Sequence, residues 1–194
     1  QFIVLGGPTR PDTRPSFESY YLGPEFAGVP LALGSNDPLP YGRRSPDILA
    51  EEQKNEFDLV NKLNLLSNVE YPRDDMLRAR IRSYELAFRM QTAVPEGVNF
   101  SSETKETQRL YGLDQSSTKS AGQKLLAARR LVERGVNFVQ VYPTPYGKWD
   151  SHKKLKTLHA QMSSQVDKPI AGLLKDLKRR GLMNDVLVVF CTEF

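Results

Sequence analysis

Two acidic residues and a histidine near the C-terminal end of the sequence have the types and the spacing of a metal-binding site. Asp150 and His152 are separated by one residue and follow the apolar run 138–141. Glu193 follows a second apolar run, residues 186–190. We expect these runs to be parallel strands joined by a helix with a right-handed crossover. The three side chains would then face the same edge of the sheet, where open α/β folds bind their ligands.

This combination of residues suits a divalent cation. A carboxylate oxygen and an imidazole nitrogen, completed by a carboxylate from the neighbouring strand, can bind zinc, calcium or manganese. Such an ion would polarise a phosphoryl or sulfuryl oxygen and lower the pKa of a bound water or hydroxyl nucleophile. The argument for a metal ligand is strongest for Glu193, because a carboxylate that ends a buried apolar run needs a partner or a metal ion.

The residues around this motif also have structural interpretations. Asp150 is a candidate cap for a helix beginning at Ser151, and His152 would then be an N-terminal helix residue bonded to a loop carbonyl. His159 lies two helical turns after His152 on about the same face, so it is either a half-buried helix residue or part of a substrate pocket. Trp149 is a candidate wall of the same pocket.

No nucleophile can be named from the sequence. Residues 6–9, Gly-Gly-Pro-Thr, follow a strand-like run but lack the glycine pattern and the Lys-Ser/Thr ending of a phosphate-binding loop. The Gly-x-Ser-x-Gly pattern of serine hydrolases is absent. Cys191 lacks the Pro and Arg neighbours that a sulfatase-type nucleophile requires, and we expect it to be a small buried hydrophobe within its strand.

Composition and charge narrow the class of protein. With 194 residues, of which 39% are hydrophobic and 26% charged, the chain fits one globular domain or part of a larger one. The net charge of +4 includes short basic clusters that we interpret as solvated helix faces. These clusters are Arg129-Arg130, Lys153-Lys154 and Lys178-Arg179-Arg180. They form no basic stripe with interleaved aromatics, so we predict no nucleic-acid binding.

A single cysteine excludes an internal disulfide, and no stretch reaches the roughly 18 apolar residues of a membrane span.

The apolar pattern predicts an α/β fold, a largely parallel sheet flanked by helices, in one incomplete domain over residues 1–194. Within it we expect an irregular strand and loop region over 1–46, a helical region over 47–135, and a strand-helix-strand segment over 136–194 that carries the candidate site. The expected helices cover residues 47–68, 73–94, 101–112, 117–135 and 153–181. In the last of these, Asp167-Lys168-Pro169 is a candidate break, with Asp167 as the cap of the second half.

Several segments resemble the bacterial "domain of unknown function 1501" family, a sulfatase-like group abundant in planctomycetes. Trp149-Asp150-Ser151-His152 is one of these segments, and Thr192-Glu193-Phe194 is similar to the start of the family's Glu-Phe-Gly-Arg-Thr motif. The other matching segments are residues 80–91, 110–114, 128–142, 167–177 and 180–182. The resemblance covers nearly the whole chain from about residue 20 onward.

The resemblance implies a partial alkaline-phosphatase-like fold, with metal ions bound at the carboxyl edge of a largely parallel sheet. Asp150 and His152 match the Asp/His metal-ligand motif of that superfamily. Glu193 stands where sulfatases have the Asp of an Asp-His-Gly motif. The nucleophile region of the family would lie upstream, so we expect an internal fragment that is inactive by itself.

The expected function is therefore that of a metal-dependent hydrolase of sulfate or phosphate esters, with small molecules or polysaccharides as substrates. Two alternatives stay open: a sulfatase-like binding or surface protein without catalysis, and a phosphotransferase or mutase of the same superfamily. The resemblance also implies a periplasmic or secreted protein, because family members commonly carry an export signal. We identify no targeting segment in the sequence itself.

Overall fold

The structure is a computed structural model of the chain. It describes residues 2–7, 17–19, 21–22, 26–34, 38–39, 47–71, 97–145 and 147–191, together with single helical positions between residues 77 and 94. Glu193 lies outside the described residues, as do most of the predicted helix over 73–94 and the second half of the Gly-Gly-Pro-Thr motif.

A small parallel sheet forms one half of the described fold. Its strands are β1 (Phe2–Leu5), β2 (Val29–Leu31) and β3 (Phe138–Val141), in the order β2-β1-β3. Ile3 in the central strand is opposite Val29 on one side and Val139 on the other. The central strand is apolar and buried, as expected for a parallel strand covered on both faces. The predicted α/β class is therefore confirmed.

The strand β2 was not predicted, because its three residues lie in a stretch whose glycines and prolines indicate loop. Pro30 lacks a backbone N–H, and it is tolerated because β2 bonds only to β1 among the described strands.

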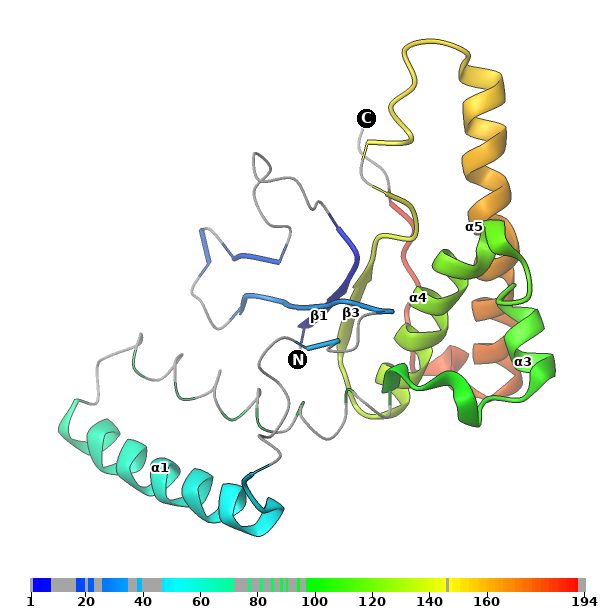
Figure 1. Ribbon diagram of the computed structural model, residues 1–194. Coiled ribbons are helices and arrows are strands. Elements are labelled where there is room, and N and C mark those ends of the chain that lie inside the picture. The colour runs from blue at the N-terminus through cyan, green and yellow to red at the C-terminus, as the bar shows by residue number, and fades with distance from the viewer. Residues whose placement is uncertain are drawn as a thin grey trace.

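The helices follow the predicted order. They are α1 (Ala50–Glu70), η2 (Phe100–Ser102), α3 (Lys105–Leu110), α4 (Ser116–Glu133), α5 (Leu155–Arg179) and η3 (Leu182–Asn184). Helices α3, α4 and α5 gather on one side of the sheet, whereas α1 lies away from them (Figure 1). Gly135 and Gly181 follow α4 and α5 with φ of 83° and 73°, the left-handed conformation that ends many helices. Within the described part of the chain, no helix combines the length and the hydropathy needed to span a membrane.

The structure corrects two helix predictions: one predicted helix is divided in two, and one predicted break is absent. The predicted helix over 101–112 is divided, because Thr104 accepts a hydrogen bond from the Thr107 backbone N–H at 3.1 Å and starts α3. Helix α5 is continuous across Pro169, so Asp167 is an exposed residue within the helix rather than a cap. Val166 and Leu173, one turn to either side of Pro169, are both buried, and this packing outweighs the loss of one backbone hydrogen bond.

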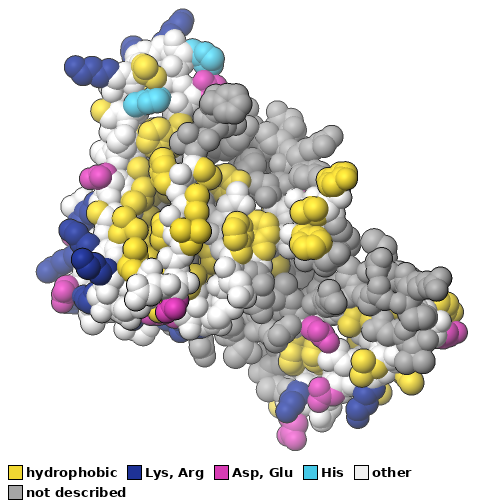
Figure 2. Space-filling model, turned by 180° about the vertical axis from the view of Figure 1, so that it is seen from behind, with side chains coloured by type: hydrophobic (Ala, Val, Ile, Leu, Met, Phe, Trp, Pro, Cys, Tyr) yellow, Lys and Arg dark blue, Asp and Glu magenta, His cyan; other side chains and the backbone are white. Residues whose placement is uncertain are grey.

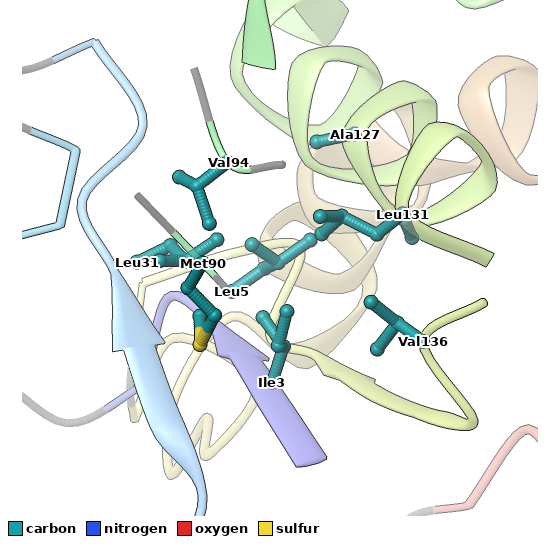
Figure 3. Packing of buried hydrophobic residues seen from close by; sticks show 9 residues of the cluster. Ile3, Leu5, Leu31, Met90, Val94, Ala127, Leu131 and Val136 are labelled. Carbon is teal, nitrogen blue, oxygen red and sulfur yellow. The ribbon is translucent and has the colours of Figure 1, made fainter. Parts of the chain in front are cut away.

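The buried residues form two clusters that share helix α4. The first cluster joins the sheet to α4, with Ile3 and Leu5 against Ala127 and Leu131, and it also contains Met90 (Figure 3). In the second cluster, the apolar side chains of α4 and α5 pack together around the turn after α3. Its buried members are Tyr111, Leu125, Leu126, Leu173 and Leu177. Helix α4 is therefore buried on two opposite sides.

Two glycines allow α4 and α5 to approach the turn after α3 very closely. A Cβ atom on Gly122 of α4 would overlap the backbone carbonyl oxygen of Tyr111. A Cβ atom on Gly172 of α5 would overlap the carbonyl oxygen of Leu110. The turn is thus held between two helix backbones at a separation that only glycine permits.

The apolar run 186–190 does not form the strand that the sequence predicts. Val186–Phe190 has no strand assignment, and Leu187, Val189 and Phe190 are exposed. Within the described residues no strand pairs with this run, and of its side chains Val186 alone packs, partly buried, against the second cluster. Hydrophobic side chains gather on the face seen in Figure 2. Cys191 is an exposed free thiol, so the prediction that it is buried is wrong for the same reason.

Candidate active site

The candidate site lies on the loop that leaves the carboxyl end of β3 and leads into α5. Two contacts anchor the start of this loop. The Tyr142 backbone N–H donates to the Leu5 carbonyl at 2.9 Å, and the Lys124 ammonium group of α4 donates to the Tyr142 carbonyl at 2.8 Å. Burial lowers the pKa of Lys124. The loop is therefore fixed to both the sheet and α4 before it reaches the candidate ligands.

Asp150 and His152 form a close pair, as the sequence predicts. His152 Nε2 lies 3.1 Å from Asp150 Oδ1 and 3.2 Å from Oδ2. Both side chains are open to solvent, with 85% of His152 and 70% of Asp150 exposed. Helix α5 begins only at Leu155, after Lys154 with φ of 54°. The interpretation of Asp150 as the cap of a helix starting at Ser151 is therefore wrong.

Trp149 and His159 form a second pair beside the first. Their rings meet edge to face, with centroids 5.6 Å apart and an angle of 79° between the planes. His159 Nε2 lies 2.9 Å from the Trp149 carbonyl oxygen, and because a carbonyl only accepts, the ring nitrogen donates. The indole Nε1–H donates to the hydroxyl of buried Thr144 at 2.9 Å. The first turns of α5 thus hold the loop just before Asp150.

The donor set at this edge of the sheet fits part of a metal site. A carboxylate oxygen and an imidazole nitrogen already converge, and both are atom types that bind divalent cations. Among the residues that the structure describes, no three His, Cys, Asp or Glu side chains are grouped for metal binding. Asp150 and His152 therefore account for two ligands, and the predicted third, Glu193, falls outside the described residues.

A buried ionic network on the other side of α4 is the feature that sequence reasoning missed. Arg129 and Asp176 are 2% and 0% exposed, and Arg129 Nε lies 3.1 Å from Asp176 Oδ2. Asp176 also accepts hydrogen bonds from Arg179, Arg180 and the Tyr111 hydroxyl, at 2.9, 3.0 and 3.1 Å. The interpretation of Arg129-Arg130 as a solvated helix face is wrong, because acids from other elements neutralise both side chains.

Glu103 provides the second centre of this network. It accepts from Arg129 at 2.8 Å and from Arg130, whose Nε also donates to the Gly97 carbonyl. Burial raises the pKa of Glu103, but the hydrogen bonds and charges of the two arginines outweigh it and leave the pKa below its usual range. The pKa of Asp176 is lowered in the same way: burial raises it, but the hydrogen bonds of Arg179 and Arg180 and the charge of Arg129 outweigh burial.

The network was visible in the sequence as a break of the apolar pattern. Arg129 lies four residues after Leu125 on the buried stripe of α4, and Asp176 lies three residues after Leu173 on that of α5. Opposite charges on two stripes that face each other indicate a buried pair. An open pocket over the network is lined by five arginines and three glutamates, and each glutamate is paired with at least one arginine. We therefore assign the network to stability rather than to ligand binding.

Comparisons with known proteins give one family and no individual relative. Neither the curated proteins nor the solved structures yielded a match. The sequence model of the family described as "Protein of unknown function (DUF1501)" matches residues 1–194, so the chain belongs to this family.

Proposed function

We propose that the chain carries part of the metal site of a hydrolase that acts on sulfate or phosphate esters. The observation that supports this proposal is the exposed Asp150–His152 pair, in which His152 Nε2 lies 3.1 Å from Asp150 Oδ1. The pair follows a parallel strand at its carboxyl end, which is where α/β enzymes bind ligands. Its resemblance to the Asp/His motif of the alkaline phosphatase superfamily points to the same chemistry.

In this proposal Asp150 and His152 hold a divalent cation, and Glu193 supplies a further ligand. The cation, when bound, would polarise the ester oxygen and lower the pKa of a water or hydroxyl nucleophile. His159 acts through the protein: its hydrogen bond to the Trp149 carbonyl orients the residue that precedes Asp150. The exposed position of the ligand pair suits a large ester substrate. That the protein is secreted or periplasmic is proposed from the family resemblance alone.

The metal proposal predicts a loss of cation binding in the Asp150→Ala variant. Titration calorimetry with zinc, manganese and calcium should detect binding to the wild-type chain. Removal of the ligand should weaken it by about 10–100-fold or more, because even groups that only support a metal ligand have effects of that size. Asp167→Ala is the matched control, since Asp167 is an exposed acid on α5 and its removal should change nothing. Absence of any bound cation in the wild type would contradict the proposal.

The reaction class needs a separate assay of catalysis by the protein. Aryl sulfate and aryl phosphate panels should show net hydrolysis that depends on the cation and on Asp150. Transfer of the phosphoryl group without net hydrolysis would identify a phosphotransferase or mutase instead. Cation binding without turnover of any ester would identify a binding protein that keeps the ligands but lacks catalysis.

A further inference from the structure

Trp149 offers a rigid aromatic surface next to the candidate metal ligands. Its indole N–H is bonded to Thr144, and its ring contacts His159, so the side chain is oriented before any ligand arrives. The residue is nevertheless 39% exposed. Because the only polar atom of the ring is already bonded, the exposed part of the indole can make only apolar contacts with a ligand. An exposed apolar ring that is fixed on two sides is a preorganised binding surface.

The loop around Trp149 is strongly basic. Lys148, Lys153, Lys154 and Lys156 are all exposed, and Asp150 is the only acidic residue between positions 142 and 156. Since Asp150 is itself paired with His152, the lysine charge is not neutralised within this segment. The sequence interpretation of Lys153-Lys154 as a solvated helix face is confirmed only in part: both lysines are exposed, but they precede α5, on the loop that carries Trp149. Such a surface attracts anions over distances of about 10 Å at moderate ionic strength.

We propose that Trp149 and the lysines of residues 148–156 bind a sugar ring that carries a sulfate, phosphate or carboxylate group, as part of an anionic polysaccharide. The inference rests on the proposed function and names the substrate class of the same site. A sugar ring has an apolar C–H face that can lie on the indole and a rim of hydroxyl groups that can stay hydrated at an open surface. Its anionic substituents would be held by the lysines.

The surroundings of Trp149 favour a sugar over single-stranded nucleic acid, which also combines rings with negative charge. Proteins that bind nucleic-acid single strands stack successive bases on several aromatic side chains. Among the described residues of the segment 142–156, Tyr142 is the only other Phe, Tyr or Trp, and it is half-buried with its hydroxyl accepting a hydrogen bond from Gln140. The ligand that we propose is therefore a sugar ring with a charged substituent, which recurs along a flexible polysaccharide chain.

The test uses Trp149 as its own reporter, because the chain has a single tryptophan. A sulfated galactan oligosaccharide, added in the presence of EDTA, should change the fluorescence of Trp149 saturably. The neutral galactan and poly-uridylate should have little effect. The chelator separates this test from the metal proposal: sugar binding without metal supports the surface, whatever the hydrolysis assays show.

Variants distinguish a binding surface from a merely structural role. Followed by the anisotropy of a labelled oligosaccharide, Trp149→Ala should weaken binding by about tenfold or more. Trp149→Phe should keep most of the affinity, since it preserves an aromatic ring. Lys153→Gln should weaken binding and reduce its dependence on salt, whereas Lys119→Gln, an exposed lysine of α4, should not. Unchanged affinity in Trp149→Ala, or equal binding of the neutral galactan or of poly-uridylate, would overturn the proposal.

Discussion

Replacing Asp176 with alanine is expected to lower the free energy of unfolding by about 1–3 kcal/mol. The reason is the buried position of its partners: Arg129 is only 2% exposed, and although it keeps the carboxylates of Glu103 and Glu133, it would lose the one 3.1 Å from its Nε. The Tyr111 hydroxyl would also lose its acceptor in a buried environment. Urea denaturation of the wild type and the variant measures the difference.

Two controls test this explanation. Asp167→Ala changes an exposed acid on the same helix and should alter stability by no more than about 0.5 kcal/mol. Asp176→Asn keeps the shape of the side chain and an acceptor for Tyr111, so its loss should be smaller than that of Asp176→Ala but still clear. If Asp176→Ala were as stable as Asp167→Ala, the network would not hold the helices together.

The same network makes stability depend on pH. The pKa values of Asp176 and Glu103 in the folded state lie below their ordinary values of 3.8 and 4.5. The unfolded chain therefore binds more protons in mildly acidic solution, and stability falls as the pH decreases. This contribution is complete above the ordinary pKa values and is lost as the pH falls through the lower folded values. Unfolding measured from neutral to strongly acidic pH should show a smaller loss for Asp176→Asn than for the wild type.

Replacing Gly172 with alanine should destabilise the protein by about 1–3 kcal/mol or more, even though alanine is the better helix former. In an ordinary exposed helix the substitution would stabilise by roughly 0.5–1 kcal/mol. Here the added Cβ would overlap the Leu110 carbonyl oxygen, which cannot rotate away as a side chain can. Either α5 must shift outward or the turn after α3 must deform, and both separate the packed side chains around Leu173.

The sign of this change makes it diagnostic, and thermal or urea denaturation measures it. Gly122→Ala should have a similar effect, because its Cβ would overlap the Tyr111 carbonyl oxygen from the other side. Ser163→Ala, at an exposed position of α5, is the matched control and should stabilise slightly. A stabilising effect of Gly172→Ala would mean that α5 does not approach the turn as closely as described.

The elements that the sequence predicts well are those whose pattern is long and local. Helices α4 and α5 have apolar stripes over several turns and glycines after their last residues, and both lie close to the predicted positions. The run 186–190 has the composition of a strand, but a strand also needs a partner, and composition does not report one. The strand β2 shows the converse. Its three residues, which include Pro30, do not have the composition of a strand, but they form one because they pair with β1.

The candidate site was predictable to the extent that its residues are close in sequence. Asp150 and His152 are two positions apart on one loop, so their approach follows from local geometry. The contact of His159 with Trp149 needs the turn between the loop and α5, which the sequence indicates only as a shared pocket. Arg129 and Asp176 are 47 positions apart in the sequence and lie on different helices, so their pairing depends on how α4 and α5 pack. Whether Glu193 joins the pair stays a prediction.

The shared position of α4 between the two clusters has a consequence for motion. Any opening that separates the sheet from α4, or α4 from α5, breaks one whole cluster, so the centre of α4 has no low-energy route to solvent. Its amide protons should therefore exchange with deuterium only through global unfolding, at the slowest rate in the protein. Those of α1, whose Leu59, Leu63 and Leu66 are exposed, should exchange through local opening. Mass spectrometry of deuterated peptides would measure this difference, and equal protection of the two helices would contradict it.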